Sequence, residues 1–335
     1  AAALVADNKG LLAMDESTPT CNKRFSPLGI PQNEDLRRAY RELLVTTPGL
    51  GASISGAILY DETIRQHTQD GTSMIAALIA AGIIPGIKVD AGTHSLAGHP
   101  GELITDGLDG LRERLGDYAR LGARFAKWRG VFVVSDDLPS HGCIEANAHA
   151  LARYAALSQE EGLVPIIEPE VLMDGDHSLA RCRVVTEAVQ HAVFAQLHSQ
   201  RVLLEGIILK PSMILPGTRS TESASGSVTA EMIAEATVGC LLRTVPAAVP
   251  GVAFLSGGQT PERATERLNA MHVRFKTRLP WAVTFSFSRA LQQPVLAIWH
   301  GAAANAQAAQ RALLQRAQCA RAARRGTYAP SMEPT

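Results

Sequence analysis

Short apolar runs recur along the chain and alternate with longer stretches in which apolar residues follow a helical spacing. A short run that is rich in β-branched residues is typical of a strand buried on both faces. Such runs lie at residues 11–14, 53–60, 83–89, 131–134, 163–167, 204–210, 251–255 and 282–286. We therefore predict eight strands, one for each run.

The helical spacing predicts helices between these strands, at residues 34–44, 73–81, 108–121, 145–159, 178–200, 229–242, 261–271 and 302–323. Asn33 and Thr260 are expected N-caps, and Pro261 suits a first helical turn. The Ser/Thr-rich segment 220–228 is predicted to be a mobile loop. A basic run lies late in the last helix and consists of Arg321, Arg324 and Arg325. We expect this run to face solvent or to complement the helix dipole.

Strands that alternate with helices indicate a parallel sheet, and eight such units can close into a (β/α)8 TIM barrel. We find no internal repeat and no linker, so we predict one domain over residues 1–335 with a tail from about residue 326. The active sites of such barrels lie at the carboxyl ends of the strands. Polar residues gather at those ends, namely Asp15, Lys88, Lys127, Glu168, Glu170, Lys210, Ser256 and Arg289.

Composition excludes several classes of function. Lys and Arg total 32, as do Asp and Glu, so no global charge recruits nucleic acid or a membrane. The five cysteines are an odd number without paired spacing, which suits a reducing compartment. We see no signal peptide and no membrane-spanning run, and we expect a cytoplasmic protein, or a plastid one if a transit peptide was removed. No His spacing, Walker loop or Rossmann fingerprint suggests a metal, a nucleotide or another cofactor, and we expect none.

Lys210 carries the first chemical hypothesis. It ends the apolar run Ile207-Ile208-Leu209, and Pro211 keeps it extended at the end of that strand. A lysine in an apolar wall loses hydration, and its amine pKa falls toward neutrality. A neutral amine can attack a carbonyl and form a Schiff base. The alternative, at about even odds from this strand alone, is a lysine that snorkels to water.

Four further groups could assist such an amine. Lys127 would face Lys210 across the barrel mouth and lower its pKa as a second cation; alternatively, it only pairs with an acid at the rim. Glu168 and Glu170 lie two apart on an extended segment, so one carboxyl could stay protonated and act as an acid; alternatively, both form salt bridges. Asp15 could remove the proton of a substrate hydroxyl, or it could cap a turn at residues 17–19.

Two groups of residues suit phosphate. Backbone N–H groups of glycines and an arginine bind anions, and the loops after the seventh and eighth strands often hold phosphate in barrels. The first group is Ser256, Gly257, Gly258 and Arg289. The second, at the opposite rim, is Ser17, Thr20, Lys23, Arg24 and Lys88. Two such sites around a reactive lysine suggest a substrate with phosphate at both ends, although a glycine pair alone is also common in tight turns.

The sequence resembles the class I, or Schiff-base, fructose-1,6-bisphosphate aldolases over about residues 4 to 330. The resemblance rests on seven blocks: Gly10-Leu11-Leu12-Ala13-Met14-Asp15-Glu16-Ser17, Gly86-Ile87-Lys88-Val89-Asp90, Phe125-Ala126-Lys127-Trp128-Arg129, Pro165-Ile166-Ile167-Glu168-Pro169-Glu170, Leu204-Glu205-Gly206-Ile207-Ile208-Leu209-Lys210-Pro211, Phe254-Leu255-Ser256-Gly257-Gly258-Gln259 and Phe285-Ser286-Phe287-Ser288-Arg289-Ala290. Ser288 departs from the Gly of many members and could crowd a phosphate there.

The resemblance implies a role for each site residue. Lys210 is similar to the Schiff-base lysine, Glu168 to the acid that dehydrates the carbinolamine, and Asp15 to the group at the C4 hydroxyl. Lys127 would lie beside the C2 and C4 oxygens, and Glu170 would relay protons. The implied substrate-binding residues are Ser256, Gly257, Gly258 and Arg289 for the C1 phosphate, and Ser17, Lys88, Arg24 and Arg129 for the rest.

The resemblance also implies a metal-independent lyase of sugar-phosphate metabolism and a homotetramer. It implies cleavage of fructose 1,6-bisphosphate to dihydroxyacetone phosphate and glyceraldehyde 3-phosphate in glycolysis, or the reverse reaction in gluconeogenesis or the Calvin cycle. Two alternatives stay open. One is a Schiff-base aldolase that prefers another sugar phosphate, such as sedoheptulose 1,7-bisphosphate. The other is a non-enzymatic scaffold on the same fold.

Overall fold

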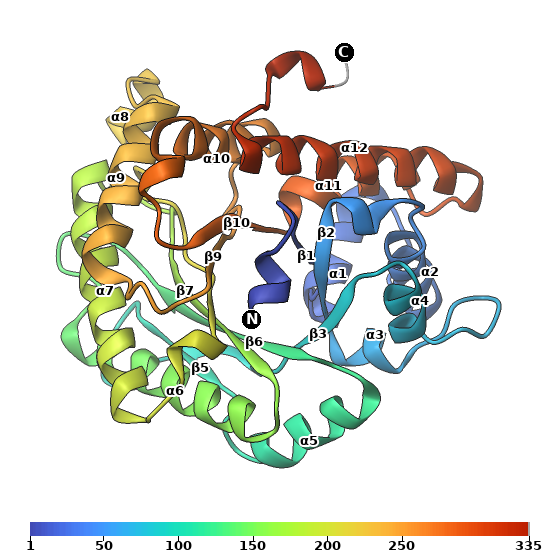
Figure 1. Cartoon of the computed structure of the whole chain (residues 1–335), viewed down its shortest axis with the longest axis horizontal. Coiled ribbons are helices and arrows are strands. Elements are labelled where there is room, and N and C mark those ends of the chain that lie inside the picture. The colour runs from blue at the N-terminus through green and yellow to red at the C-terminus, as the bar shows by residue number, and fades with distance from the viewer. Residues whose placement is uncertain (334–335) are drawn as a thin grey trace.

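The protein forms a closed barrel of eight parallel strands, seen end-on in the computed structural model of Figure 1, which describes residues 1–333. The strands follow one another around the barrel in the order β1-β10-β9-β8-β7-β6-β3-β2. Their bounds are β1 Gly10–Ala13, β2 Ile54–Leu59, β3 Ile84–Lys88, β6 Phe125–Phe132, β7 Val164–Val171, β8 Ile208–Leu209, β9 Gly251–Phe254 and β10 Ala282–Phe287. Each predicted strand overlaps one of these, and the predicted (β/α)8 fold is confirmed.

Helices surround this barrel (Figure 1). They are α1 Thr18–Phe25, α2 Glu34–Val45, α3 Asp61–Arg65, α4 Met74–Ala80, α5 Leu111–Leu121, α6 His141–Glu160, α7 Leu179–Ser199, α8 Thr221–Ser225, α9 Ala230–Thr244, α10 Pro261–Phe275, α11 Arg289–Trp299 and α12 Ala306–Arg325. The predicted caps are confirmed, because Asn33 Oδ1 accepts from the Leu36 N–H at 2.9 Å and Thr260 Oγ1 from the Arg263 N–H at 3.3 Å.

The barrel interior is apolar at its amino end. The 3₁₀ helix Ala2–Val5 buries Leu4 and Val5 against this end. Phe125 fills the centre so closely that a Cβ on Gly86 would lie 2.2 Å from its ring, so only glycine fits there. The interior cluster consists of Leu4, Val5, Leu11, Ala13, Ile58, Phe125, Ile166, Ile208 and Ala253. This apolar packing leaves the carboxyl end of the barrel for the charged side chains of the interior.

The fourth predicted strand was placed too late in the chain. We predicted residues 131–134, whereas β6 begins at Phe125 and ends at Phe132. Lys127 therefore lies inside the strand and not at its end. Phe125 belongs to the interior cluster and Trp128 to the outer core, so successive side chains alternate between the interior and the helices. The prediction followed the unbroken apolar run and missed this alternation.

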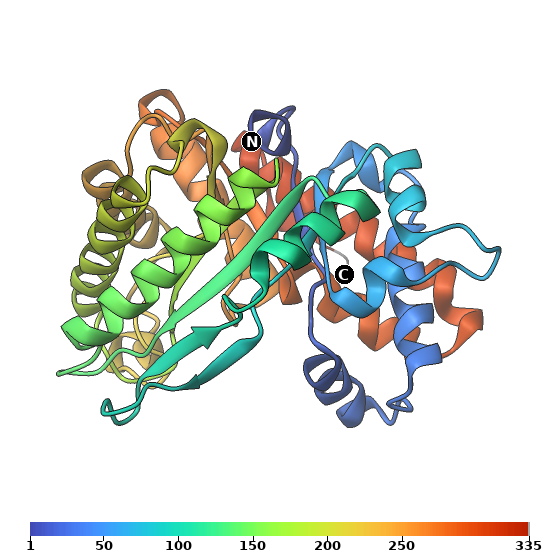
Figure 2. The same ribbon diagram turned by 90° about the horizontal axis from the view of Figure 1, so that it is seen from below.

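Several elements were not predicted. The chain between β3 and α5 forms an antiparallel hairpin of β4 Gly92–Ser95 and β5 Leu103–Asp106. Figure 2 shows this hairpin and the N-terminus at opposite ends of the molecule. The segment 220–228 was predicted to be a loop, but its Ser220 hydroxyl accepts from the Ser223 N–H and caps α8. The helices α1, α3 and α11 were also not predicted.

Arg324 was expected to face solvent or to complement the helix dipole, and the first of these expectations is wrong. Its side chain is buried and donates to the backbone carbonyls of Val5, Ala6 and Lys9. No acidic side chain pairs with it among residues 1–333, so the carbonyls supply its hydrogen-bond acceptors. Arg324 thus joins α12 to the segment that closes the amino end of the barrel.

We expect Arg324→Met to lower the free energy of unfolding by about 2 kcal/mol, because three backbone carbonyls lose a charged donor. Urea titration followed by circular dichroism measures this change. Arg325→Met, which alters an exposed neighbour in the same helix, is the control and should stay within about 0.5 kcal/mol of the parent. Equal midpoints for the two variants would contradict the structural role of Arg324.

Candidate active site

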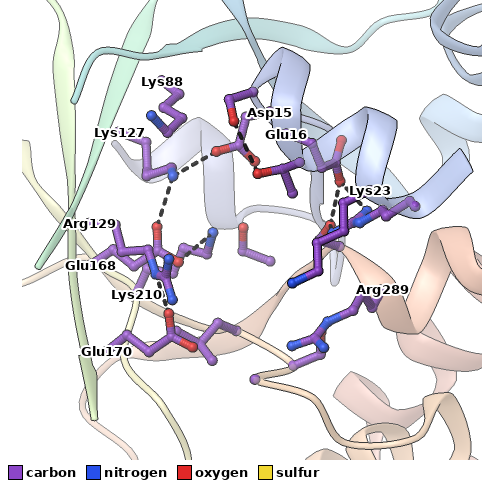
Figure 3. Close-up of a pocket in the computed structure, with 18 residues that line it drawn as sticks. Asp15, Glu16, Lys23, Lys88, Lys127, Arg129, Glu168, Glu170, Lys210 and Arg289 are labelled. Atoms are coloured by element: carbon purple, nitrogen blue, oxygen red, sulfur yellow. Dashed lines mark hydrogen bonds and ion pairs between the residues drawn. The ribbon is translucent and has the colours of Figure 1, made fainter. Parts of the chain in front are cut away.

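A cavity of about 500 Å³ opens at the carboxyl ends of the strands (Figure 3). It is lined by Asp15, Glu16, Ser17, Thr20, Lys23, Arg24, Lys88, Lys127, Arg129, Glu168, Glu170, Lys210, Leu255, Ser256, Gly257, Ser286, Ser288 and Arg289. All site residues predicted from the sequence are among these except Gly258. The residues come from seven strand ends and the loops that follow them, so the fold brings together positions that are far apart in the chain.

Lys210 follows β8 directly and points into this cavity (Figure 3). Its backbone N–H still bonds to the Ile167 carbonyl at 2.7 Å, which holds the residue in line with the neighbouring strand. Only 3% of the residue is exposed, and its Nζ lies 3.0 Å from Glu168 Oε1. The lysine therefore does not snorkel to water, and that alternative is excluded.

Lys127 lies beside Lys210, as predicted, because both contact Glu168. Its Nζ is 3.2 Å from Glu168 Oε2 and 2.6 Å from Asp15 Oδ2. Burial alone would lower the pKa of Lys127, but Asp15, Glu168 and Asp90 outweigh it and raise that pKa well above its ordinary value. Burial likewise favours neutral Asp15, but Lys127 and Lys210 hold its pKa well below the usual range. Both groups are therefore charged near neutral pH.

Glu168 and Glu170 point to the same cavity from β7, as their spacing predicted. They do not share one partner, because Glu170 pairs with Arg129 while Glu168 lies between the two lysines. Burial lowers the pKa of Arg129, and Glu170 and Glu168 raise it more strongly. Asp15 is not the helix cap of the alternative interpretation, since Ser17 occupies the N-cap position of α1.

The loop after β9 carries the first group of residues that we predicted to bind an anion. Gly257 and Gly258 have φ values of 54° and 90°, a left-handed conformation that favours glycine. A Cβ on Gly258 would lie 3.3 Å from Arg289 Nη2, so this glycine leaves room for the guanidinium although it does not line the cavity. Arg289 has no acidic partner among residues 1–333. Burial and the nearby Arg24 lower its pKa.

At the opposite rim, Lys88 already has an acidic partner, because its Nζ lies 2.7 Å from Asp90 Oδ1. Arg24 was predicted at the same rim, but it pairs with Glu16 and donates to Ser288 Oγ at 3.2 Å, next to Arg289. Ser17 and Thr20 share a hydrogen bond of 3.0 Å at the start of α1. Lys23 points into the cavity in Figure 3 and has no such partner among the described residues. An anion would compete with Asp90 for Lys88 and with Glu16 for Arg24.

Two buried acids of the site were missed. Asp90 lies just beyond β3, and its place after a strand end could have revealed it. Glu16 holds Arg41 at 2.5 Å and accepts from Ser288 Oγ at 2.7 Å and Gln292 Nε2 at 2.8 Å. No sequence signal indicated these contacts, because their partners come from α2 and from the segment after β10. Ser288 thus uses its hydroxyl within this network.

Burial would raise the pKa of Glu16, but Arg41 and Arg24 outweigh it and lower the pKa to about 2. Among residues 1–333, no three His, Cys, Asp or Glu side chains gather as a candidate metal site. No helix in that range has the length and apolar character needed to cross a membrane.

We expect Glu16→Gln to lose about 3 kcal/mol of stability at pH 7, because two arginines lose their buried counter-charge. The folded pKa of about 2 lies below the ordinary 4.5. The contribution is therefore complete above about pH 4.5 and disappears as the pH falls toward 2. Unfolding free energies of parent and variant across pH 7 to 3 should converge on acidification. A difference in unfolding free energy that did not change with pH would contradict this role of Glu16. The control is Glu160→Gln at an exposed ion pair, and its unfolding free energy should differ little from that of the parent.

The comparisons with known proteins agree with this geometry. The family model described as fructose-bisphosphate aldolase class-I matches residues 1–335. A probable fructose-bisphosphate aldolase class 1 of Xanthomonas campestris is 58% identical over 299 residues, which cover 89% of this chain and 88% of the relative. The cytosolic fructose-bisphosphate aldolase 6 of Arabidopsis thaliana is 50% identical over 328 residues, covering 98% and 90%.

A solved structure shows the same fold. The fructose-bisphosphate aldolase of Plasmodium falciparum, crystallised with TRAP and a small-molecule inhibitor, has a TM-score of 0.95 and 45% identity. The match covers 98% of this chain and 93% of that one. The whole-chain family match and these identities lead to one conclusion: the chain belongs to the class I fructose-bisphosphate aldolases, which are lyases.

Proposed function

We propose that this aldolase cleaves fructose 1,6-bisphosphate through an imine on Lys210. The observation that carries the proposal is the buried Nζ of Lys210, which lies 3.0 Å from Glu168 at the centre of the cavity. A neutral amine there can attack the C2 carbonyl of the open-chain ketose and form a carbinolamine. Glu168 is the nearest acid, and it would first accept the proton that Lys210 loses and then donate it to the carbinolamine hydroxyl, which leaves as water.

The imine then acts as the electron sink for carbon–carbon cleavage. A protonated imine at C2 accepts the electrons of the C3–C4 bond when the C4 hydroxyl loses its proton. Asp15 would take that proton, and Lys127, 2.6 Å from Asp15 Oδ2, would steady the oxygens at C2 and C4. Glyceraldehyde 3-phosphate leaves, and the remaining enamine takes up a proton and is hydrolysed to dihydroxyacetone phosphate.

Glu170 and the phosphate-binding residues complete the proposal. Glu170, paired with Arg129, would relay protons to and from the cluster. Ser256, Gly257, Gly258 and Arg289 would hold the C1 phosphate. Ser17, Lys88, Arg24 and Arg129 would contact the far half of the substrate. Lys88 and Arg289 lie on opposite sides of one cavity (Figure 3), which supports a substrate that carries phosphate at both ends.

We also infer that the protein works as a homotetramer in the cytoplasm. Resemblance to a family of tetramers supports the first point, and the cytosolic relatives in Arabidopsis and spinach support the second. Large apolar side chains remain exposed on the single chain, including Val273 at 67% and Leu203 at 61%. Light scattering coupled to size-exclusion chromatography measures the mass, and a monomeric mass would contradict the tetramer.

We expect borohydride reduction in the presence of dihydroxyacetone phosphate to add mass to the peptide that contains Lys210. Reduction converts the imine to a stable secondary amine, so peptide mass spectrometry locates it. Lys210→Met should lose the label and the activity. The control Lys23→Met removes another cavity lysine and should keep the label on Lys210. A label elsewhere would refute the imine on Lys210, and activity that vanishes with a chelator would favour a metal mechanism.

We expect fructose 1,6-bisphosphate to be the preferred substrate in steady-state assays. Fructose 1-phosphate lacks the group that would meet Lys88 and Arg24, so its kcat/KM should be lower. Sedoheptulose 1,7-bisphosphate, assayed in parallel, tests the remaining alternative. A higher kcat/KM for the longer sugar would overturn the substrate assignment but not the imine. No turnover of any of the three, with a folded protein, would favour a scaffold.

A further inference from the structure

Asp90 lies close to two lysines of the candidate site. Its carboxylate has only 4% exposure, and its Oδ1 lies 2.7 Å from Lys88 Nζ. Its Oδ2 lies 3.9 Å from Lys127 Nζ. One buried carboxylate therefore stands between the lysine proposed to bind the far phosphate and the lysine proposed to act at C4.

The backbone around Asp90 holds this carboxylate in place. Asp90 Oδ1 accepts from the Gly92 N–H at 3.2 Å, and Oδ2 from the Arg129 N–H at 3.4 Å. Arg114 of α5 donates to the carbonyl of the preceding residue, Val89, at 2.8 Å. The strand end, the hairpin and α5 thus converge on one position, so Asp90 cannot withdraw when its partner Lys88 is taken by a ligand.

We propose that Asp90 is a positioning residue that couples phosphate binding at Lys88 to the charge around Lys127. The proposal rests on the function proposed above, in which Lys88 holds the far phosphate. A phosphate dianion competes with Asp90 for the three Nζ hydrogens of Lys88. When Lys88 turns to the phosphate, the negative charge of Asp90 has Lys127 as its nearest remaining partner.

The consequence concerns Glu168. Lys127 is held by Asp15, Glu168 and Asp90 at 2.6, 3.2 and 3.9 Å. When Asp90 attracts Lys127 more strongly, the ion pair between Lys127 and Glu168 weakens. Lys210, whose Nζ lies 3.0 Å from Glu168 Oε1, then becomes the main partner of that carboxyl group. Occupation of the far phosphate site would in this way prepare the acid for carbinolamine dehydration. A ligand shifts an equilibrium between two states only if it interacts differently with each of them. Here the two states differ in whether Lys88 pairs with Asp90 or with the phosphate.

A simpler role makes a different prediction. If Asp90 only balances the charge of two lysines, its loss should slow every substrate to a similar extent. If Asp90 couples phosphate binding to Lys127, its loss should remove the increase in kcat that the far phosphate gives. Fructose 1,6-bisphosphate and fructose 1-phosphate differ in that phosphate alone, so the two substrates separate the two roles.

The test is Asp90→Asn, which keeps the size of the side chain and an oxygen for the Gly92 N–H but removes the charge. We expect the ratio of kcat for fructose 1,6-bisphosphate to kcat for fructose 1-phosphate to fall about tenfold, the scale of one close charge coupling. The fall should appear in kcat more than in KM, and fructose 1-phosphate should change about twofold or less. Asp106→Asn, in an exposed carboxylate of the adjacent hairpin, is the matched control and should leave the ratio unchanged.

A double-mutant cycle with Lys88→Met completes the test. If coupling passes through the Lys88–Asp90 contact, the effects of the two substitutions on the ratio of kcat values must be non-additive. The reason is that either substitution alone already removes that contact. Equal losses with both substrates, or additive effects, would overturn the proposal. Reduction with borohydride and dihydroxyacetone phosphate is run on each folded variant. If the label on Lys210 were missing from the parent, the proposed function would fail, whereas a normal label with an unchanged ratio would refute only the coupling.

Discussion

The buried carboxylate of Glu168 is the interaction on which the site depends. Its two oxygens bind two different lysines, Lys210 at 3.0 Å and Lys127 at 3.2 Å. Each ion leaves water at a large cost, and only close pairing inside the protein offsets that cost. Glu168 lies inside β7, between neighbours that pair in the barrel, so the acid cannot follow either lysine away. The sheet therefore holds the backbone of Glu168 in place, while its two oxygens bring the two amines together.

The apolar packing of the barrel explains why these charges lie at one end. Leu4 and Val5 close the amino end, and the Phe125 ring occupies the centre. Lys127, two residues after Phe125 on β6, points to the same interior but lies above this apolar layer. A lysine one layer deeper would meet no acid and would leave an unpaired charge. The apolar layer thus supports the catalytic layer and excludes water from beneath it.

The sequence predicted the fold and most of the site because both rest on short local patterns. The eight apolar runs predicted the strands of the barrel. The polar residues near the ends of those runs predicted the site, and twelve of the thirteen predicted site residues line the cavity. The residues that the sequence analysis misplaced or missed are those whose role depends on tertiary contacts. Arg324 looked solvated in a basic run but serves three carbonyls of the N-terminal segment. Glu16 gave no local signal, because Arg41 and Gln292 reach it from distant segments.

The two rims of the cavity hold their cations in different ways, and this difference gives the substrate a direction. Arg289 has no acidic partner among residues 1–333, so a phosphate there meets a guanidinium that burial has already stripped of some water. Lys88 is held by Asp90 at 2.7 Å, so a phosphate at Lys88 must displace a carboxylate. Such an exchange yields less net binding energy than filling an open site. Under the proposed function, Arg289 therefore anchors the substrate, and the far rim converts its binding energy into a rearrangement of charge near the imine.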